Sequence, residues 1–144
     1  MSNNNNSNNG IAEILEVILV LQKNAGCADS ALDSCDKPIL GGCNATCVCN
    51  TRPIMLYLCG QGNTPLSMPT TKENIVCTDT TTEGCSNVFR VEKVDCNAAT
   101  FRVLAPNPDE TSLYPYISTN SFFSVNLDCL CCIRCLNDTC VECV

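Results

Sequence analysis

Residues 88–104 read Val88-Phe89-Arg90-Val91-Glu92-Lys93-Val94-Asp95-Cys96-Asn97-Ala98-Ala99-Thr100-Phe101-Arg102-Val103-Leu104. Two runs rich in Val and Phe, 88–94 and 100–104, flank Asp95-Cys96-Asn97, whose residue types favour a turn. The pattern predicts a β-hairpin. The tripeptide Phe-Arg-Val occurs in both strands, which strand propensity explains without an internal repeat.

The chain before this hairpin also shows strand patterns. Ile54–Cys59 is a short apolar run that ends at Gly60-Gln61-Gly62, so it predicts a further strand. Between it and the hairpin, residues 63–86 contain Pro65, Pro69 and a Thr-rich run. This composition indicates a long, irregular or edge segment.

Beyond the hairpin, the prolines of residues 105–116 predict a loop. The apolar residues of 123–127 then alternate with polar ones, which predicts a half-buried strand. If that strand continues, Cys129 and Cys131 lie on its apolar face and Cys132 lies on the other.

Residues 11–24 are predicted to form an amphipathic helix. Apolar residues recur there at i, i+3 and i+4 spacing, and Gly26 follows at a place where helices commonly end. Glu13, Glu16 and Lys23 make up the polar strip. Two interpretations stay open: the helix packs only on its own domain, or it packs partly against a neighbouring subunit.

The predicted fold is mainly β, a single-domain β-sandwich-like fold with one N-terminal α-helix. We expect a disordered Asn/Ser-rich tail at 1–10, the amphipathic helix at 11–24, a β domain at 25–136 and a cysteine-bearing C-terminal tail at 137–144. A chain of about 150 residues buries roughly 68–70% of its unfolded surface, so a core can form without disulfides.

Charge and the N-terminal sequence exclude several functions. The net charge is −7 and the pI about 4.3, so phosphate backbones would repel the chain and we expect no nucleic-acid partner. Residues 2–10 lack Lys and Arg, and Glu13 and Glu16 interrupt the apolar stretch that follows. We therefore expect neither a signal peptide nor a membrane span.

Fifteen of the 144 residues are cysteine, and none is histidine. This density is typical of oxidising surroundings, which conflicts with the lack of a signal peptide. Synthesis in the cytosol, followed by exposure when the cell lyses, satisfies both observations. The odd number of cysteines favours at least one thiol that stays free or bonds to another chain.

The cysteines in loops and near the C-terminus are the candidates for cross-linking between subunits, because flexible, exposed segments can meet the geometry that a disulfide requires. Cys59 is either a small apolar core residue or a cross-link. The candidates are Cys27, Cys35, Cys43, Cys47, Cys49, Cys129, Cys131, Cys132, Cys135, Cys140 and Cys143.

A metal site is the main alternative, in the form of a zinc or iron module. Cys132/Cys135 and Cys140/Cys143 are two CxxC pairs, but their separation is shorter than in most zinc sites with four cysteine ligands. Because the chain lacks histidine, the usual Cys–His and Ser–His pairs are absent. We expect no enzymatic activity, no catalytic residues, no cofactor and no bound metal.

Four blocks of the sequence carry a resemblance to a known family. They are Asn50-Thr51-Arg52-Pro53-Ile54-Met55-Leu56-Tyr57, residues 88–95, residues 101–104, and Leu127-Asp128-Cys129-Leu130-Cys131-Cys132-Ile133-Arg134-Cys135-Leu136. In this order they resemble the CotY/CotZ/ExsY family of cysteine-rich spore surface proteins.

The resemblance spans roughly residues 11–136 and implies a structural protein of the endospore coat, crust or exosporium. It implies self-assembly into hexamers and a disulfide-reinforced two-dimensional lattice. The partners would be further copies of the chain and other coat or exosporium proteins. It also implies synthesis in the mother-cell cytoplasm and a final place on the spore surface.

Overall fold

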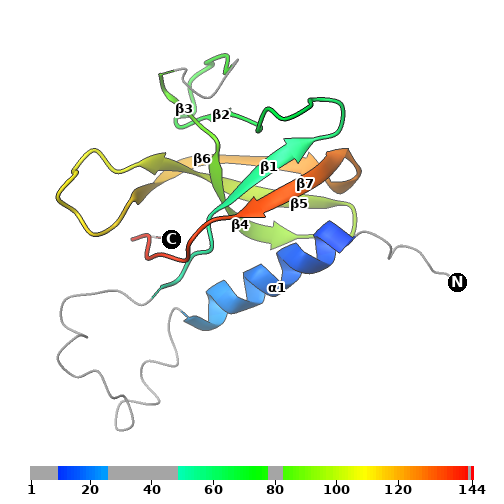
Figure 1. Ribbon diagram of the computed structural model, residues 1–144, viewed down its shortest axis with the longest axis horizontal. Coiled ribbons are helices and arrows are strands. Elements are labelled where there is room, and N and C mark those ends of the chain that lie inside the picture. The colour runs from blue at the N-terminus through cyan, green and yellow to red at the C-terminus, as the bar shows by residue number, and fades with distance from the viewer. Residues whose placement is uncertain (1–9, 26–48, 78–82, 143) are drawn as a thin grey trace, which may run out of the picture.

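The computed structural model describes residues 10–25, 49–77, 83–142 and 144 (Figure 1). Five of the cross-linking candidates, Cys27, Cys35, Cys43, Cys47 and Cys143, lie outside the described residues. So do residues 1–9 of the tail expected at 1–10, while Gly10 is the first residue of α1. The elements are α1 (Gly10–Ala25), β1 (Ile54–Leu58), β2 (Met68–Pro69), β3 (Cys85–Ser86), β4 (Val88–Val94), β5 (Ala98–Pro106), β6 (Tyr116–Asn126), the 3-10 helix Leu127–Cys129 and β7 (Leu130–Cys135).

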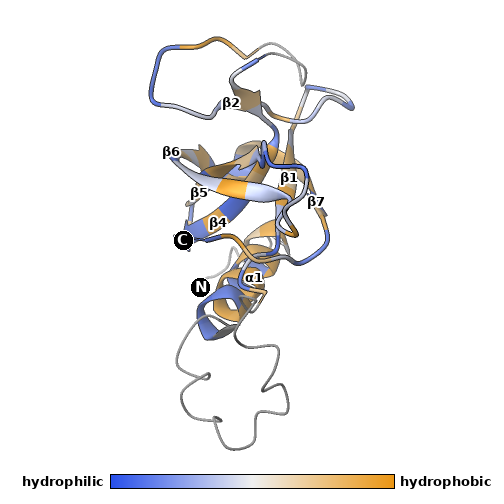
Figure 2. Ribbon diagram, turned by 90° about the vertical axis from the view of Figure 1, so that its left-hand side faces the viewer, coloured by the Kyte–Doolittle hydropathy of each residue, from blue (hydrophilic) through white to orange (hydrophobic). Residues whose placement is uncertain are grey.

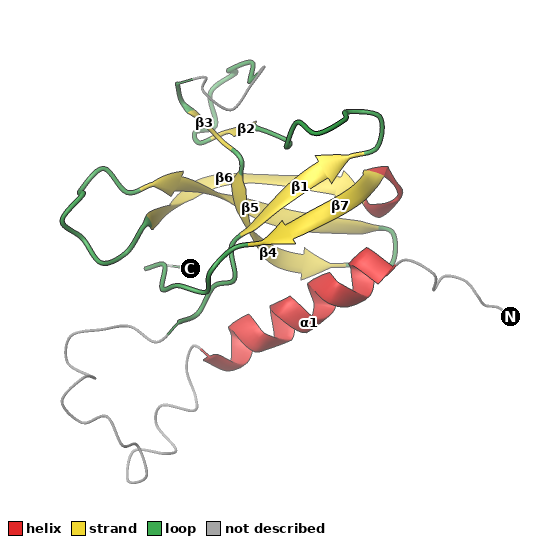
Figure 3. Cartoon of the chain, in the orientation of Figure 1, coloured by secondary structure: helices red, strands yellow, loops and turns green. Residues whose placement is uncertain are grey.

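The expected mainly β fold with one N-terminal helix is confirmed (Figure 3). Five strands form an antiparallel sheet in the order β6-β5-β4-β1-β7. The predicted hairpin is present as β4 and β5, in which Phe89 lies opposite Val103. The short strands β2 and β3 form a separate sheet at the end of the molecule away from α1 (Figures 2 and 3).

The large sheet is strongly curled. β6 and β7 lie at opposite edges of it, yet only the 3-10 helix separates them in sequence. The chain from Asn126 to Leu130 spans at most about 14 Å, because an extended residue covers about 3.6 Å. Crossing the sheet when flat would take four strand spacings of about 4.8 Å, about 19 Å in all. The sheet therefore bends until its two edges approach, with β1 and β7 in front of β5 and β6 (Figure 1).

The predicted strand does not continue through Cys131. β6 ends at Asn126, whose Oδ1 accepts a hydrogen bond of 2.9 Å from the backbone N–H of Asp128 and caps the 3-10 helix. Such side chains compete with strand hydrogen bonds for the backbone. The prediction that Cys129 and Cys131 share an apolar face is therefore wrong, and both are exposed.

Helix α1 packs where β1 and β4 diverge. These strands pair at Ile54 and Phe89, the single pair in their register. Leu15 and Ile18 of α1 are buried in the main core, which also takes up Phe89 and Phe101. The helix thus completes a core that the curled sheet leaves open.

Gln22 is the polar residue on the buried face of α1, with 4% of its surface exposed. Its Nε2 donates to the backbone carbonyl of Val91 at 2.9 Å, and its Oε1 accepts from the backbone N–H of Arg52 at 3.1 Å. A buried amide is costly unless both of its ends are bonded. Gln22 meets that condition and fixes α1 against β4 and the approach to β1.

Candidate functional site

Free thiols are spread over the surface of the molecule. Among the described residues, each cysteine that is free is also exposed. Free cysteine is otherwise among the most buried residue types in proteins. These thiols are Cys49 before β1, Cys96 in the β4–β5 turn, Cys129 in the 3-10 helix, and Cys132 and Cys135 on β7.

β7 presents two of these thiols on an edge strand. In the described part of the chain it pairs with β1 alone, with Cys132 opposite Tyr57 and Cys135 opposite Ile54. Residues three apart on a strand point to opposite faces and lie about 10 Å apart. The Cys132/Cys135 pair is therefore unlike a zinc knuckle, in which both sulfurs of a CxxC bind one ion.

Cys59 and Cys131 form a disulfide at the end of β1, with their Cα atoms 4.9 Å apart. Both residues are exposed. The interpretation of Cys59 as a core residue is therefore wrong. The register between β1 and β7 shifts at Tyr57 and Leu58, and this irregularity brings Cys131 next to Cys59.

An open groove of about 730 Å³ runs past this disulfide. Gly60 and Gly62 lie on its rim with φ values of 88° and 68°, and a side chain built on either would meet no atom within 4 Å. The lining includes the disulfide itself, Cys132 and Arg134.

Two other cysteine sites are less accessible. Cys77 and Cys85 form a disulfide that is half-buried, with Cα atoms 6.0 Å apart. Cys140 is disulfide-bonded as well and is only 4% exposed. The sequence predicted that the last sixteen residues were exposed and flexible, but Cys140 and Val141 are buried.

The Asn-Thr-Arg-Pro block, residues 50–53, holds the C-terminal segment 136–141 in place. The Asn50 side chain bonds both the N–H and the carbonyl of Val141 at 3.0 Å. Thr51 and Thr139 exchange backbone hydrogen bonds of 3.1 and 3.0 Å. The backbone N–H of Leu136 donates to the Pro53 carbonyl at 2.8 Å.

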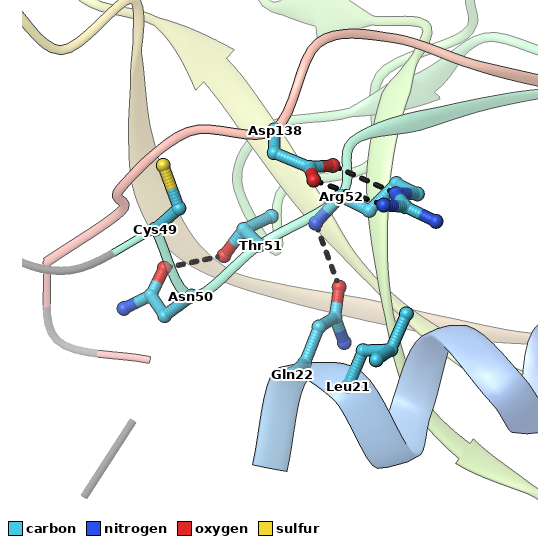
Figure 4. A pocket seen from close by; sticks show the side chains of 7 residues that line it. All are labelled: Leu21, Gln22, Cys49, Asn50, Thr51, Arg52 and Asp138. Atoms are coloured by element: carbon cyan, nitrogen blue, oxygen red, sulfur yellow. Dashed lines mark hydrogen bonds and ion pairs between the residues drawn. The ribbon is translucent and has the colours of Figure 1, made fainter. Parts of the chain in front are cut away.

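Arg52 completes this contact with a two-pronged ion pair to Asp138, at 2.7 and 2.9 Å (Figure 4). The hydrogen bonds from the guanidinium lower the pKa of the Asp138 carboxyl, and the same bonds raise the pKa of Arg52. The two side chains are 36% and 46% exposed. Solvent therefore screens the pair, and we assign it under about 1 kcal/mol.

A second charged network lies inside the sheet. Arg90 is 8% exposed; its Nε donates to Thr51 Oγ1 at 2.9 Å and one NH group donates to Glu92 at 2.8 Å. Arg102 donates to the same Glu92 oxygen at 2.9 Å and lies 4.5 Å from the ring centre of Phe122. Glu92 therefore bridges two arginines that face each other across β4 and β5, one negative charge shared between two positive ones.

The outer face of α1 is apolar and exposed. Ile14, Val17, Val20 and Leu21 are 47%, 58%, 54% and 48% exposed. Ile14, Val17 and Leu21 recur at i, i+3 and i+7, so they share one stripe of the helix, which we call the outer stripe. The sequence predicted an amphipathic helix, and this stripe is the apolar part of it that the core does not take up.

The structure brings some of the sequence candidates together and separates others. Cys129, Cys131, Cys132 and Cys135 lie along one edge of the sheet, whereas Cys49 lies at the approach to β1. Cys96 was not among the candidates, although its position in a predicted turn was a signal of exposure.

Two further observations concern the described residues only. In those residues no group of three His, Cys, Asp or Glu side chains is arranged to hold a metal ion. Nor is any helix of the described part long and apolar enough to cross a bilayer.

Comparison with known proteins identifies a family. The model of the family described as Spore coat protein Z matches residues 1–114. Neither the curated proteins nor the solved structures contain a match to the chain.

Proposed function

This chain belongs to the Spore coat protein Z family, and from that premise we propose that it self-assembles into a disulfide-reinforced two-dimensional lattice on the endospore surface. The layer is the outer coat, the crust or the exosporium. The building unit is a homo-oligomer, with a hexamer as the expected ring. Other coat or exosporium proteins are its further partners. Its role is structural rather than enzymatic.

The observation that carries this proposal is the set of exposed thiols. A soluble monomer gains nothing from exposed free cysteines, which invite oxidation and association. Cys49, Cys96, Cys129, Cys132 and Cys135 are all exposed. They lie on different elements, so bonds from one subunit can reach more than one neighbour, as a sheet requires.

The outer stripe of α1 supports a non-covalent contact that forms before the covalent one. Its residues Ile14, Val17 and Leu21 are each about half exposed. Burial of apolar surface contributes about 25 cal/mol per Å². Once such a contact holds two subunits together, their thiols meet at a high effective concentration, and a disulfide makes the contact resistant to dilution.

The test compares the recombinant full chain with a variant in which Cys49, Cys96, Cys129, Cys132 and Cys135 are all replaced by Ser. We expect the wild-type chain to give ordered sheets in negative-stain electron microscopy. Non-reducing gels should show ladders that collapse on reduction. The five-serine variant should lose most of the ladder and keep its far-UV circular dichroism.

A matched control removes the same kind of residue from an internal site. The Cys77→Ser/Cys85→Ser variant lacks a half-buried disulfide and keeps every exposed thiol, so it should retain the ladder. A wild-type chain that stays monomeric with and without reductant contradicts the proposal. Stoichiometric zinc or iron in protein purified without reductant, with unfolding on chelation, would favour the metal module instead.

A further inference from the structure

The Cys59–Cys131 disulfide differs from Cys77–Cys85 in its accessibility. Both of its cysteines are exposed, whereas Cys77 and Cys85 are half-buried. Exposed disulfides are the labile ones in thiol–disulfide exchange, because a thiolate must reach one sulfur to attack it. One disulfide of this chain is thus open to attack and another is less accessible.

The surroundings of Cys59 leave room for an incoming chain. The groove passes Cys59, Cys131 and Cys132, and Gly60 and Gly62 border it. Neither glycine has an atom within 4 Å of the place that a side chain would fill. Because residues 60 and 62 are glycines, a segment of another molecule can approach the disulfide from this side without meeting a side chain at either position.

Within the chain, the neighbouring thiol Cys132 is badly placed to attack. Adjacent Cα atoms lie about 3.8 Å apart, below the roughly 4.4–6.8 Å that disulfides usually span. Cys131 and Cys132 are also adjacent on β7, where successive side chains point to opposite faces. Cys132 is therefore badly placed to replace Cys59 as the disulfide partner of Cys131. Its thiol remains available to react with another molecule.

The geometry points to the Cys59–Cys131 disulfide as an exchange site that accepts a thiolate from a second copy of this chain. The incoming sulfur forms a bond with one of the two sulfurs, the Cys59–Cys131 bond breaks, and the other sulfur leaves as a thiolate. One disulfide is consumed and one is formed, so no oxidant takes part. An intrachain link becomes an interchain link.

This inference rests on the proposed self-assembly, since it names how two copies become joined. Each exchange also releases a new thiolate, at Cys59 or Cys131, which can attack the disulfide of a third copy. Exchange then passes from subunit to subunit with a constant number of disulfides. Once this disulfide has formed, a growing sheet could thus be cross-linked, and errors in it corrected, without further oxidant.

The first experiment needs no assembly and no variant. The oxidised full chain is treated with N-ethylmaleimide to block its thiols, and then incubated with glutathione under anaerobic conditions. Newly released thiols are trapped with iodoacetamide, and peptides are mapped by mass spectrometry. We expect glutathione on Cys59 or Cys131, the iodoacetamide label on the other, and an intact Cys77–Cys85 bond. Equal labelling of both disulfides, or no adduct at Cys59 and Cys131, overturns the inference.

The second experiment tests the partner. The blocked chain, with an affinity tag, is mixed with the unblocked chain in the absence of oxygen. We expect a mixed dimer on non-reducing gels, with its bond mapped to Cys59 or Cys131 of the blocked copy. A blocked Cys59→Ser/Cys131→Ser chain should lose this dimer, and a blocked Cys77→Ser/Cys85→Ser chain should keep it.

The outcomes separate this inference from the proposed function. If glutathione reacts at Cys59–Cys131 but no mixed dimer forms there, a second copy is not the partner and the inference is wrong. If sheets and ladders form while the Cys59–Cys131 bond stays intact throughout, exchange is wrong and self-assembly stands. If sheets and ladders do not form either, both fail.

Discussion

At the scale of single residues, the repeated Phe-Arg-Val tripeptide has a structural explanation. The two copies pair across β4 and β5, so Arg90 lies directly opposite Arg102. Like charges at opposite positions destabilise a sheet. Glu92 receives a hydrogen bond from each of them, at 2.8 and 2.9 Å, and so converts a repulsive pair into a bridged one.

Replacement of Arg90 by Ala should therefore be costly. It removes the buried cation and leaves Glu92 with Arg102 alone, and it leaves the Thr51 hydroxyl without its donor. We expect a loss of about 2 kcal/mol in the free energy of unfolding, because a hydrogen bond to a charged group contributes about 1.5–3 kcal/mol. Urea unfolding followed by far-UV circular dichroism measures it, since the chain has no Trp.

Lys93→Ala is the matched control for that measurement. Lys93 and Asp95 are 67% and 61% exposed, with the charged atoms 3.9 Å apart. A surface change of this kind stays within about 0.5 kcal/mol. If both variants lose the same amount, the Arg90 network does not stabilise the sheet.

The Arg52–Asp138 pair gives a prediction about acid. Its hydrogen bonds lower the pKa of Asp138 in the folded chain, so its contribution is present above the unfolded pKa of about 3.9 and is lost as pH falls through the folded value. Asp138→Asn should cost under about 1 kcal/mol at pH 7, because the pair is half-exposed. The difference from wild type should shrink below pH 4, and urea unfolding at pH 7 and pH 3 measures it. A cost that is larger at pH 3 contradicts this assignment.

At the scale of elements, the sequence predicted what local patterns determine. The hairpin at 88–104 and the helix at 11–24 each follow from the spacing of their own apolar residues. The course of the chain after Asn126 does not follow from such spacing. The side chain of Asn126 ends β6 at a point where the alternation of apolar and polar residues predicts that the strand continues. Residues 136–141 pack on residues 50–53 through contacts between distant parts of the chain. The periodicity of apolar residues contains no information about such contacts.

The candidate site was predicted in a similar, partial way. Composition pointed to cross-linking, but Cys96 was left out of the candidates although it lies in the predicted turn at Asp95–Asn97 and is exposed. The partner of Cys59 could not be deduced, since cysteine spacing does not determine connectivity. Exposure of Cys131 follows from the curl of the sheet and from the irregular register with β1, both of which are properties of the folded chain.

Helix α1 supplies a prediction at this scale, because its two apolar faces have different roles. Val17→Asp places a charge on the outer stripe, where the side chain is 58% exposed. We expect the variant to keep its unfolding transition within about 0.5 kcal/mol and to lose sheets in electron microscopy. Glu16→Gln, on the polar side of the same helix, should still assemble.

Leu15→Ala probes the other face of α1. Leu15 is fully buried in the main core, so the variant should lose about 2–5 kcal/mol of stability. If Val17→Asp unfolds the chain as Leu15→Ala does, the outer stripe belongs to the core. If Val17→Asp assembles normally, α1 is not a subunit contact.

At the scale of the whole molecule, the core and the sulfur chemistry are separate. The main core is built of Leu, Ile, Val, Phe and Ala from α1 and the curled sheet, and none of the cysteines that the structure describes belongs to it. The thiols and the accessible disulfide occupy turns, the 3-10 helix and the edge strand. Oxidation of the exposed thiols can therefore proceed without repacking the interior.

This separation predicts how the two mapped disulfides contribute to stability. Cys59 and Cys131 are 72 residues apart, whereas Cys77 and Cys85 are 8 apart. In the chain-entropy description, a link across the longer loop stabilises by about 4 kcal/mol and one across the shorter loop by about 2.5 kcal/mol. We expect Cys59→Ser/Cys131→Ser to lose more stability than Cys77→Ser/Cys85→Ser in urea. Both are measured at one fixed protein concentration, because the proposed assembly would shift apparent stability. Both variants should keep the far-UV spectrum of the wild type, since the core contains neither bond.

Equal losses, or a strand signal that disappears with either bond, would mean that the fold depends on its disulfides directly. In that case Cys59–Cys131 could not be exchanged between subunits without unfolding the subunit that gives it up.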